Sequence, residues 1–244
     1  MAIDLMLIVA HPDDECYVTG GIFAEYAALG RETALITLTR GKSGRSLDLC
    51  TPDELPEFRA KELRSSVEIL GIKHFSQYEY PDAAPVSRAE QHAISVPDSF
   101  VGGLQDAPRE QVVARVTAEL EKLRPKVVIG FAPDGFNRHP DHIASHQIMM
   151  AALKNTDLLE TGTRLYYFAT PTPLNPDWAD TFVPATHFKD VRDHLPQKLR
   201  AIAAHRTQAL STVGILSRMA DRIVVETFRR VHPVWDVSEH GTEL

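Results

Sequence analysis

Short continuous apolar runs, each followed at once by turn-forming residues, constrain the fold of this chain more than any other feature. The clearest runs span residues 5–10, 33–39 and 126–131. A strand covered by helices on both faces has no polar face, so its sequence is apolar throughout instead of alternating. The runs therefore predict buried strands of a mostly parallel sheet.

Helical patterns alternate with these strands. The pattern predicts helices over 21–29, 51–70, 109–123, from residue 142 to about 153, and near 191–210, and further strands near 75–78, 165–169 and 222–228. Gly30 and Gly71 stand where the first two helices would end. This alternation predicts a three-layer α/β fold, a mostly parallel sheet with Rossmann-like topology and helices on both faces. A length of 244 residues favours a single domain over 1–244.

The composition excludes several classes of partner. A net charge of −7 disfavours nonspecific binding to nucleic acid or to an anionic membrane. The first apolar run is far too short to span a bilayer, and no basic segment precedes a long apolar one as in a signal peptide. The two cysteines, Cys16 and Cys50, cannot form a disulfide framework. We therefore expect a cytoplasmic protein with no nucleic-acid or membrane partner.

Two clusters of histidine and aspartate follow predicted strands directly. The first is His11-Pro12-Asp13-Asp14-Glu15, and the second is the segment 139–142, with the sequence His-Pro-Asp-His. Ligands of open parallel sheets bind beyond the carboxyl ends of the strands. Both clusters are expected at such ends, so they can converge on one point.

This donor set suits a catalytic metal. Zinc in catalytic sites takes about three N, O or S ligands from the protein and keeps a position for water. The bound ion lowers the pKa of that water, and a nearby carboxylate can take its proton. Two adjacent aspartates could divide these tasks, one binding the metal and the other acting as the base.

Simpler interpretations apply to each residue alone. Asp13, Asp14 and Glu15 could merely cap a helix, and a lone histidine is more often a satisfied polar residue than a ligand. Spacing alone does not decide which of His139, His142 and His146 binds a metal. The coincidence of both clusters at equivalent strand ends favours the metal site.

The paired motifs, in this order, resemble the LmbE/PIG-L family of zinc-dependent N-acetylglucosaminyl deacetylases. The likeness extends over most of the chain, and further matching pieces are Thr39-Arg40-Gly41 with Gly44, Arg59 to Leu63, Leu70-Gly71, Tyr80-Pro81-Asp82 and Ala204 to Gln208. The resemblance implies a hydrolase that releases acetate from an N-acetylated sugar conjugate, a small-molecule substrate.

The resemblance also implies roles for individual residues. His11, Asp14 and His142 would bind the metal, and Asp13 would be the general base. His139 would stabilise the oxyanion or protonate the leaving amine, and Asp141 would orient His139, as carboxylates commonly do for histidines. Zinc is the expected ion, and ferrous iron suits the same ligands.

Within the family, the segment from His205 to Gln208 and residues 225–228 are similar to a bacillithiol-biosynthesis deacetylase, which acts on N-acetylglucosaminyl malate. A malate group carries two carboxylates, so cations should line the pocket. The candidates for substrate binding are Arg59, Arg206, Lys42, Arg40 and His205.

One position departs from the related mycothiol-pathway enzymes. Asn137 stands where those enzymes have a tyrosine implicated in catalysis, which weakens a mycothiol-type assignment.

Other functions remain as alternatives. These are a deacetylase for another N-acetyl sugar conjugate, including the mycothiol type, a zinc-dependent hydratase, and a non-catalytic sugar-binding protein. An intact Asp13 argues against a mere binding protein, which needs no base. A homo-oligomer is expected by analogy alone.

Overall fold

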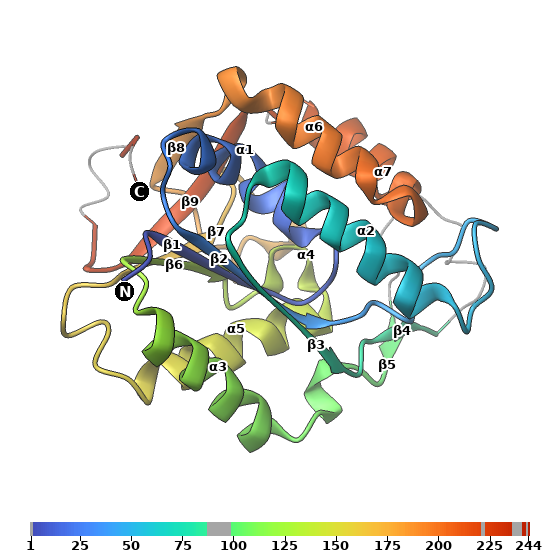
Figure 1. Ribbon diagram of the computed structural model, residues 1–244, viewed down its shortest axis with the longest axis horizontal. Coiled ribbons are helices and arrows are strands. Elements are labelled where there is room, and N and C mark those ends of the chain that lie inside the picture. The colour runs from blue at the N-terminus through green and yellow to red at the C-terminus, as the bar shows by residue number, and fades with distance from the viewer. Residues whose placement is uncertain (1, 87–98, 221–222, 236–240, 243) are drawn as a thin grey trace.

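A seven-stranded sheet forms the centre of the computed structural model, which describes residues 2–86, 99–220, 223–235, 241–242 and 244 (Figure 1). The strands lie in the order β3-β2-β1-β6-β7-β9-β8. Their bounds are β1 Leu5–Val9, β2 Thr33–Thr39, β3 His74–Tyr80, β6 Val127–Phe131, β7 Arg164–Phe168, β8 His187–Asp190 and β9 Val225–His232. All neighbours from β3 to β7 pair in parallel, and β9 pairs antiparallel with both β7 and β8. The predicted fold class is therefore confirmed.

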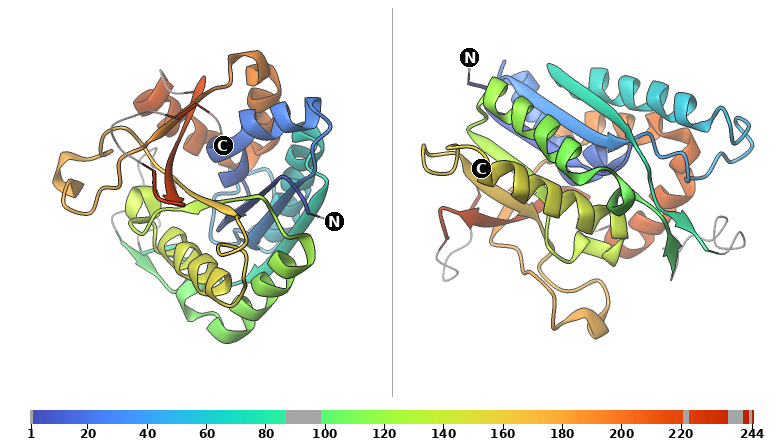
Figure 2. Two further views of the ribbon diagram at one scale, coloured as in Figure 1. Left: turned by 90° about the vertical axis from the view of Figure 1, so that its left-hand side faces the viewer. Right: turned by 90° about the horizontal axis from the view of Figure 1, so that it is seen from below.

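Helices cover both faces of the sheet, as the two views of Figure 2 show. One layer holds α3 (Arg109–Leu123) and α5 (Pro140–Lys154), and the other holds α1 (Asp14–Ala28), α2 (Leu55–Leu70) and α6 (Leu195–Ala204). Within β1, Met6 and Ile8 join the apolar core under α3 and α5, while Leu5 and Leu7 join the core on the opposite side. A strand buried on both sides has no polar face, which explains the unbroken apolar run.

Most predicted elements are present. The strand over 33–39 and the helix over 109–123 have the predicted bounds, and α2 ends where Gly71 takes a left-handed conformation, with φ 69°. The first helix begins at Asp14 instead of near residue 21, so the first motif forms its opening turn. The strand β8 has no counterpart among the predicted elements.

The prediction of one continuous helix near 191–210 is wrong. The structure divides this region into α6, a 3₁₀ turn over Arg206–Gln208 and α7 (Ala209–Met219). The interruption has a tertiary cause, because the buried carboxylate of Glu62 accepts hydrogen bonds from the backbone N and Oγ1 of Thr207. The side chain of His205 also turns into the interior at this point.

Shorter elements complete the described chain. They are the hairpin of β4 (Ala84–Pro85) and β5 (Phe100–Val101), the one-turn helix α4 (Gly135–Arg138), and 3₁₀ turns over Leu104–Asp106, Pro176–Trp178 and Arg192–His194. Among the described residues, every helix is too short or too polar to cross a membrane. The first residue of the last predicted strand, residue 222, lies outside the described residues.

Candidate active site

The two motif segments meet because their strands are neighbours. Strands β1 and β6 pair in parallel, so both carboxyl ends lie at the same edge of the sheet. A cavity of about 520 Å³ opens there, and both motifs contribute to its wall. This volume is within the usual range for small-molecule sites, roughly 300–1,000 Å³.

Three imidazoles gather at one end of this cavity. The ring centroid of His11 lies 4.7 Å from that of His139 and 5.2 Å from that of His142, and the last two rings are 4.9 Å apart. One nitrogen of each ring lies within 4.8 Å of one nitrogen of each of the others. The third candidate from the sequence, His146, hydrogen-bonds through Nδ1 to the carbonyl of Phe131 and does not line this cavity.

Asp14 connects two of the three histidines. Its Oδ2 accepts the backbone N–H of His11 at 2.8 Å and lies 3.7 Å from His11 Nδ1. Its Oδ1 lies 3.4 Å from His142 Nε2. The remaining ring nitrogen of His142, Nδ1, contacts the carbonyl of Gly135, and the ring stacks on Phe131 with centroids 3.9 Å apart. Nε2 of His142 is thereby directed towards Asp14.

The carboxylate of Asp141 has a different partner from the expected one. Its Oδ2 contacts His11 Nε2 at 2.9 Å, while the backbone N–H groups of Ala83 and Leu104 donate to its two oxygens. It is the backbone of Asp141, and not its carboxylate, that hydrogen-bonds to His139. The expected pairing with His139 is therefore corrected to a pairing with His11, because His139 turns its Nδ1 back to cap α5.

Asp13 is buried at the cavity wall in an unusual backbone conformation. It has φ 116° and ψ −28°, which costs a residue other than glycine about 1–3 kcal/mol. Burial raises the pKa of Asp13 to about 6, although Arg59 counteracts this shift. Nη2 of Arg59 lies 3.7 Å from Asp13 Oδ2.

The carboxylates around His11 stabilise positive charge on its ring. Burial opposes protonation of His11, but the hydrogen bond with Asp141 and the charge of Asp14 outweigh it and raise the pKa to about 9. The pKa of Asp14 is lowered, since the charge and hydrogen bond of His142 outweigh burial. Burial and the charges of His11 and His142 hold the pKa of His139 well below its ordinary value. These causes favour the neutral imidazole form of His139.

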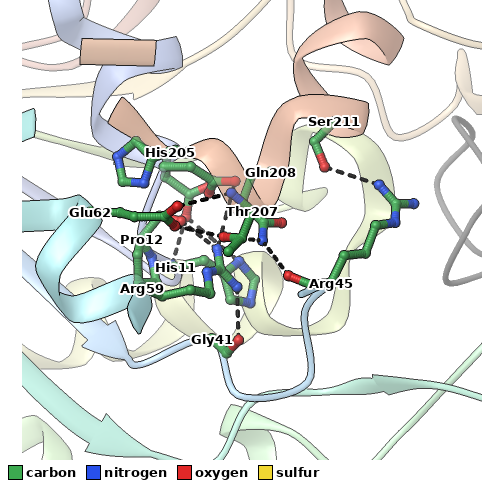
Figure 3. Close-up of polar contacts among 12 residues, drawn as sticks. His11, Pro12, Gly41, Arg45, Arg59, Glu62, His205, Thr207, Gln208 and Ser211 are labelled. Carbon is green, nitrogen blue, oxygen red and sulfur yellow. Dashed lines mark hydrogen bonds and ion pairs between the residues drawn. The ribbon is translucent and has the colours of Figure 1, made fainter. Parts of the chain in front are cut away.

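The structure separates the proposed substrate-binding cations. Arg59 lines the cavity, and its guanidinium donates to the carbonyls of Pro12 and Gly41 (Figure 3). Lys42 and Arg206 are exposed and do not line the cavity, and His205 is buried behind it. The prediction that these three side chains contact substrate in the cavity is not consistent with their positions. Arg40 does not line the cavity either, and its side chain forms ion pairs with Glu57 and Glu79.

One half-buried cation of the cavity wall, Arg45, was not among the predicted site residues. Arg45 lines the cavity, its Nη1 donates to Ser211 Oγ at 3.2 Å, and its carbonyl accepts from Nε2 of Gln208 (Figure 3). Its position in the loop after β2 carried the only signal, because loops at strand ends form such walls.

Aromatic and apolar side chains form the rest of the wall, and they come from segments far apart in the sequence. They include Tyr17, Phe136, Phe168, Leu174, Trp178 and Ile215. No spacing pattern connects these residues, so the sequence alone could not assemble them.

Comparisons with known proteins identify relatives of this chain. The PIG-L family profile, described as GlcNAc-PI de-N-acetylase, matches residues 6–153. A 1D-myo-inositol 2-acetamido-2-deoxy-alpha-D-glucopyranoside deacetylase of Mycobacteroides abscessus is 32% identical over 235 residues, covering 84% of this chain and 81% of the relative.

Solved structures share the architecture. A conserved protein of Thermus thermophilus superposes with a TM-score of 0.70 at 27% identity, covering 97% of this chain and 98% of that one. The 4-carboxy-2-hydroxymuconate hydratase GalB of a Pseudomonas superposes with a TM-score of 0.65 at 19% identity, covering 97% of this chain and 98% of that one. The second likeness shows the fold alone.

Proposed function

The chain belongs to the family of GlcNAc-PI de-N-acetylases, and on that premise we propose that it uses a divalent metal to hydrolyse the N-acetyl group of an N-acetylglucosamine conjugate. The convergence of His11, Asp14 and His142 at one end of a substrate-sized cavity supports this proposal most directly. The products would be a free amine and acetate.

The donor atoms fit a metal ion. Two ligands of a tetrahedral ion, each about 2.1 Å from it, lie about 3.4 Å apart. The carboxylate of Asp14 lies 3.7 Å from His11 Nδ1 and 3.4 Å from His142 Nε2. Asp141 contacts the other nitrogen of His11, in the arrangement by which carboxylates commonly orient metal-binding histidines. We propose zinc, and ferrous iron suits the same donors.

A bound ion supplies Lewis acidity, which lowers the pKa of water and polarises the amide carbonyl. Asp13 is the general base, because its carboxylate lines the cavity beside Asp14 and is not itself needed as a ligand. It takes a proton from the attacking water, and the buried Arg59 nearby stabilises its charged form.

The hydrogen bonding of His139 supports a role as a hydrogen-bond donor to the substrate. The backbone N–H of Asp141 donates to His139 Nδ1 at 3.2 Å, so the proton of the neutral imidazole is on Nε2. Nε2 can then donate a hydrogen bond to the oxyanion of the tetrahedral intermediate. Preorganised donors of this kind supply much of the stabilisation in acyl transfer.

The substrate is better matched by the inositol-type alternative than by N-acetylglucosaminyl malate. The relatives carry the name of an inositol-linked sugar deacetylase. Two of the cations expected for malate, Lys42 and Arg206, do not line the cavity. Asn137 does line it, and its side chain accepts the backbone N–H of His139, so it supports the loop without replacing the missing tyrosine. We therefore propose a mycothiol-type conjugate as the substrate.

The hydratase and the sugar-binding protein are the alternatives to be excluded, since the shared fold alone does not decide between them. The purified protein, loaded with Zn²⁺ or Fe²⁺, is incubated with N-acetylglucosaminyl inositol, N-acetylglucosaminyl malate and N-acetylglucosamine. Free amine and acetate are measured. We expect equal release of both, fastest from the inositol conjugate. Release from none of the three would overturn the proposal, and faster release from malate would reverse the substrate assignment.

A further inference from the structure

A second polar cluster lies directly behind the cavity and takes no part in the reaction as described so far. Its centre is the carboxylate of Glu15, whose residue is 0% exposed. Oε1 of Glu15 accepts hydrogen bonds from Ser66 Oγ at 2.5 Å and from His205 Nε2 at 2.7 Å. Oε2 accepts the backbone N–H of Asp13 at 2.9 Å. The cluster thus connects α2 and the break between α6 and α7 to the first motif.

The contact with Asp13 matters because Asp13 has a left-handed backbone at φ 116°. A conformation this unfavourable for aspartate persists only where the surroundings impose it. Arg59 holds the preceding carbonyl, that of Pro12, and Glu15 holds the N–H group of Asp13 itself. Both hydrogen bonds act on the peptide unit between Pro12 and Asp13, whose orientation determines φ of Asp13.

We propose that Glu15, Ser66 and His205 form a positioning unit that holds Asp13 in its reactive orientation. This inference rests on the base role given to Asp13 in the proposed function. His205 and Ser66 fix the carboxylate of Glu15 by donating to one oxygen, which leaves the other oxygen directed at Asp13. None of the three lines the cavity, and the hydrogen bond from the N–H of Asp13 to Glu15 connects them to a residue that does.

The burial of His205 supports a positioning role. The residue is 1% exposed, and its Nδ1 has no hydrogen-bond partner within the described part of the chain. A buried polar nitrogen without a hydrogen bond lowers the stability of the folded state, so packing alone would favour an apolar residue here. The residue is brought to this place by the break after α6, which the contact between Glu62 and Thr207 sets.

Three variants of the metal-loaded full-length protein test the unit. His205→Leu removes the donor to Glu15 and keeps an apolar volume, whereas His205→Gln keeps an N–H group near the position of Nε2. His187→Leu is the matched control, because His187 is also 1% exposed but lies in the edge strand β8. We expect His205→Leu to lower kcat at least tenfold, with KM and metal content unchanged. His205→Gln should recover most of kcat, and the control should keep the parent value.

A merely structural role predicts a different result. Loss of stability alone would lower kcat in proportion to the unfolded fraction, and Gln would not restore it selectively. If His205→Leu fails to fold, Ser66→Ala takes its place, since it removes the second donor to the same oxygen. We expect the serine variant to lower kcat less than His205→Leu, again without a change in KM.

Crystal structures of the parent and of His205→Leu, or of Ser66→Ala in its place, decide the inference independently of the substrate. We expect Asp13 to leave its left-handed conformation in the variant. If Asp13 keeps φ near that of the parent, the positioning unit is disproved, whatever the activity. A parent that releases acetate from none of the conjugates would overturn the proposed function, while the backbone of Asp13 would still decide this inference.

Discussion

The two loops that carry the histidines reach the same point by different means. In the second loop, residues 134–142, the hydrogen bonds that orient the histidines span at most seven residues, as between His142 Nδ1 and the carbonyl of Gly135. In the first loop, residues 11–15, two side chains also have distant partners: His11 contacts Asp141, and Glu15 contacts His205. The hydrogen bonds that orient the histidines of the second loop are therefore local, whereas the first loop combines local hydrogen bonds with contacts that need the completed fold.

The ligand assignment provides the strongest test of this comparison. His142→Ala removes a proposed ligand, so we expect the variant to lose its metal on dialysis and its acetate release to fall to background. His146→Ala is the matched control, because His146 lies one helical turn further along α5, hydrogen-bonds to the carbonyl of Phe131 and does not line the cavity. Metal content by mass spectrometry checks both. Equal metal loss in the two variants would contradict the assignment.

The base in the first loop gives the next largest effect. Asp13→Asn keeps the shape of the side chain but removes the proton acceptor, so we expect kcat to fall by roughly 10²–10⁴ while metal content stays at the parent value. The exposed Asp53→Asn serves as the control. The rate of acetate release measures turnover. A normal rate for the Asp13 variant would assign the base to another residue.

The pairing between the loops is tested by Asp141→Asn. Because Asp141 contacts His11 in the structure, we expect the metal affinity to fall about 10–100-fold, with kcat largely restored at saturating metal. The alternative, in which Asp141 serves His139, predicts an unchanged metal affinity and a persistently low kcat. Competition with a chelating dye measures the affinity.

The smallest effect is expected where the contact is local. Asn137→Ala removes one hydrogen bond to the backbone of His139, which should lower the free energy of unfolding by about 0.5–1.5 kcal/mol. Metal content should not change, since His142 is oriented separately by Gly135. Denaturant unfolding and metal analysis check this. A loss of metal here would show that the second loop is less independent than its contacts indicate.

The metal end of the site could be predicted largely from the sequence. Residues 11, 14, 139 and 142 follow strands whose apolar runs predict burial in a parallel sheet, and parallel neighbours share their carboxyl edge. The individual roles remain predictions until they are tested. The cavity wall was not predictable in the same way, because Arg45, Trp178 and Ile215 come from segments with no common pattern.

By itself, the sequence determined where the reactive groups lie relative to the strands: apolar runs specify buried strands, and the histidine and aspartate clusters come after them in the loops at their carboxyl ends. Only the tertiary structure decided that Asp141 contacts His11, that the helix breaks at His205, and that Lys42 and Arg206 lie outside the cavity wall. The physical reason is the distance along the chain over which each effect acts. Periodicity and capping act over a few residues, whereas these contacts join groups more than a hundred residues apart or depend on which face of a loop is covered.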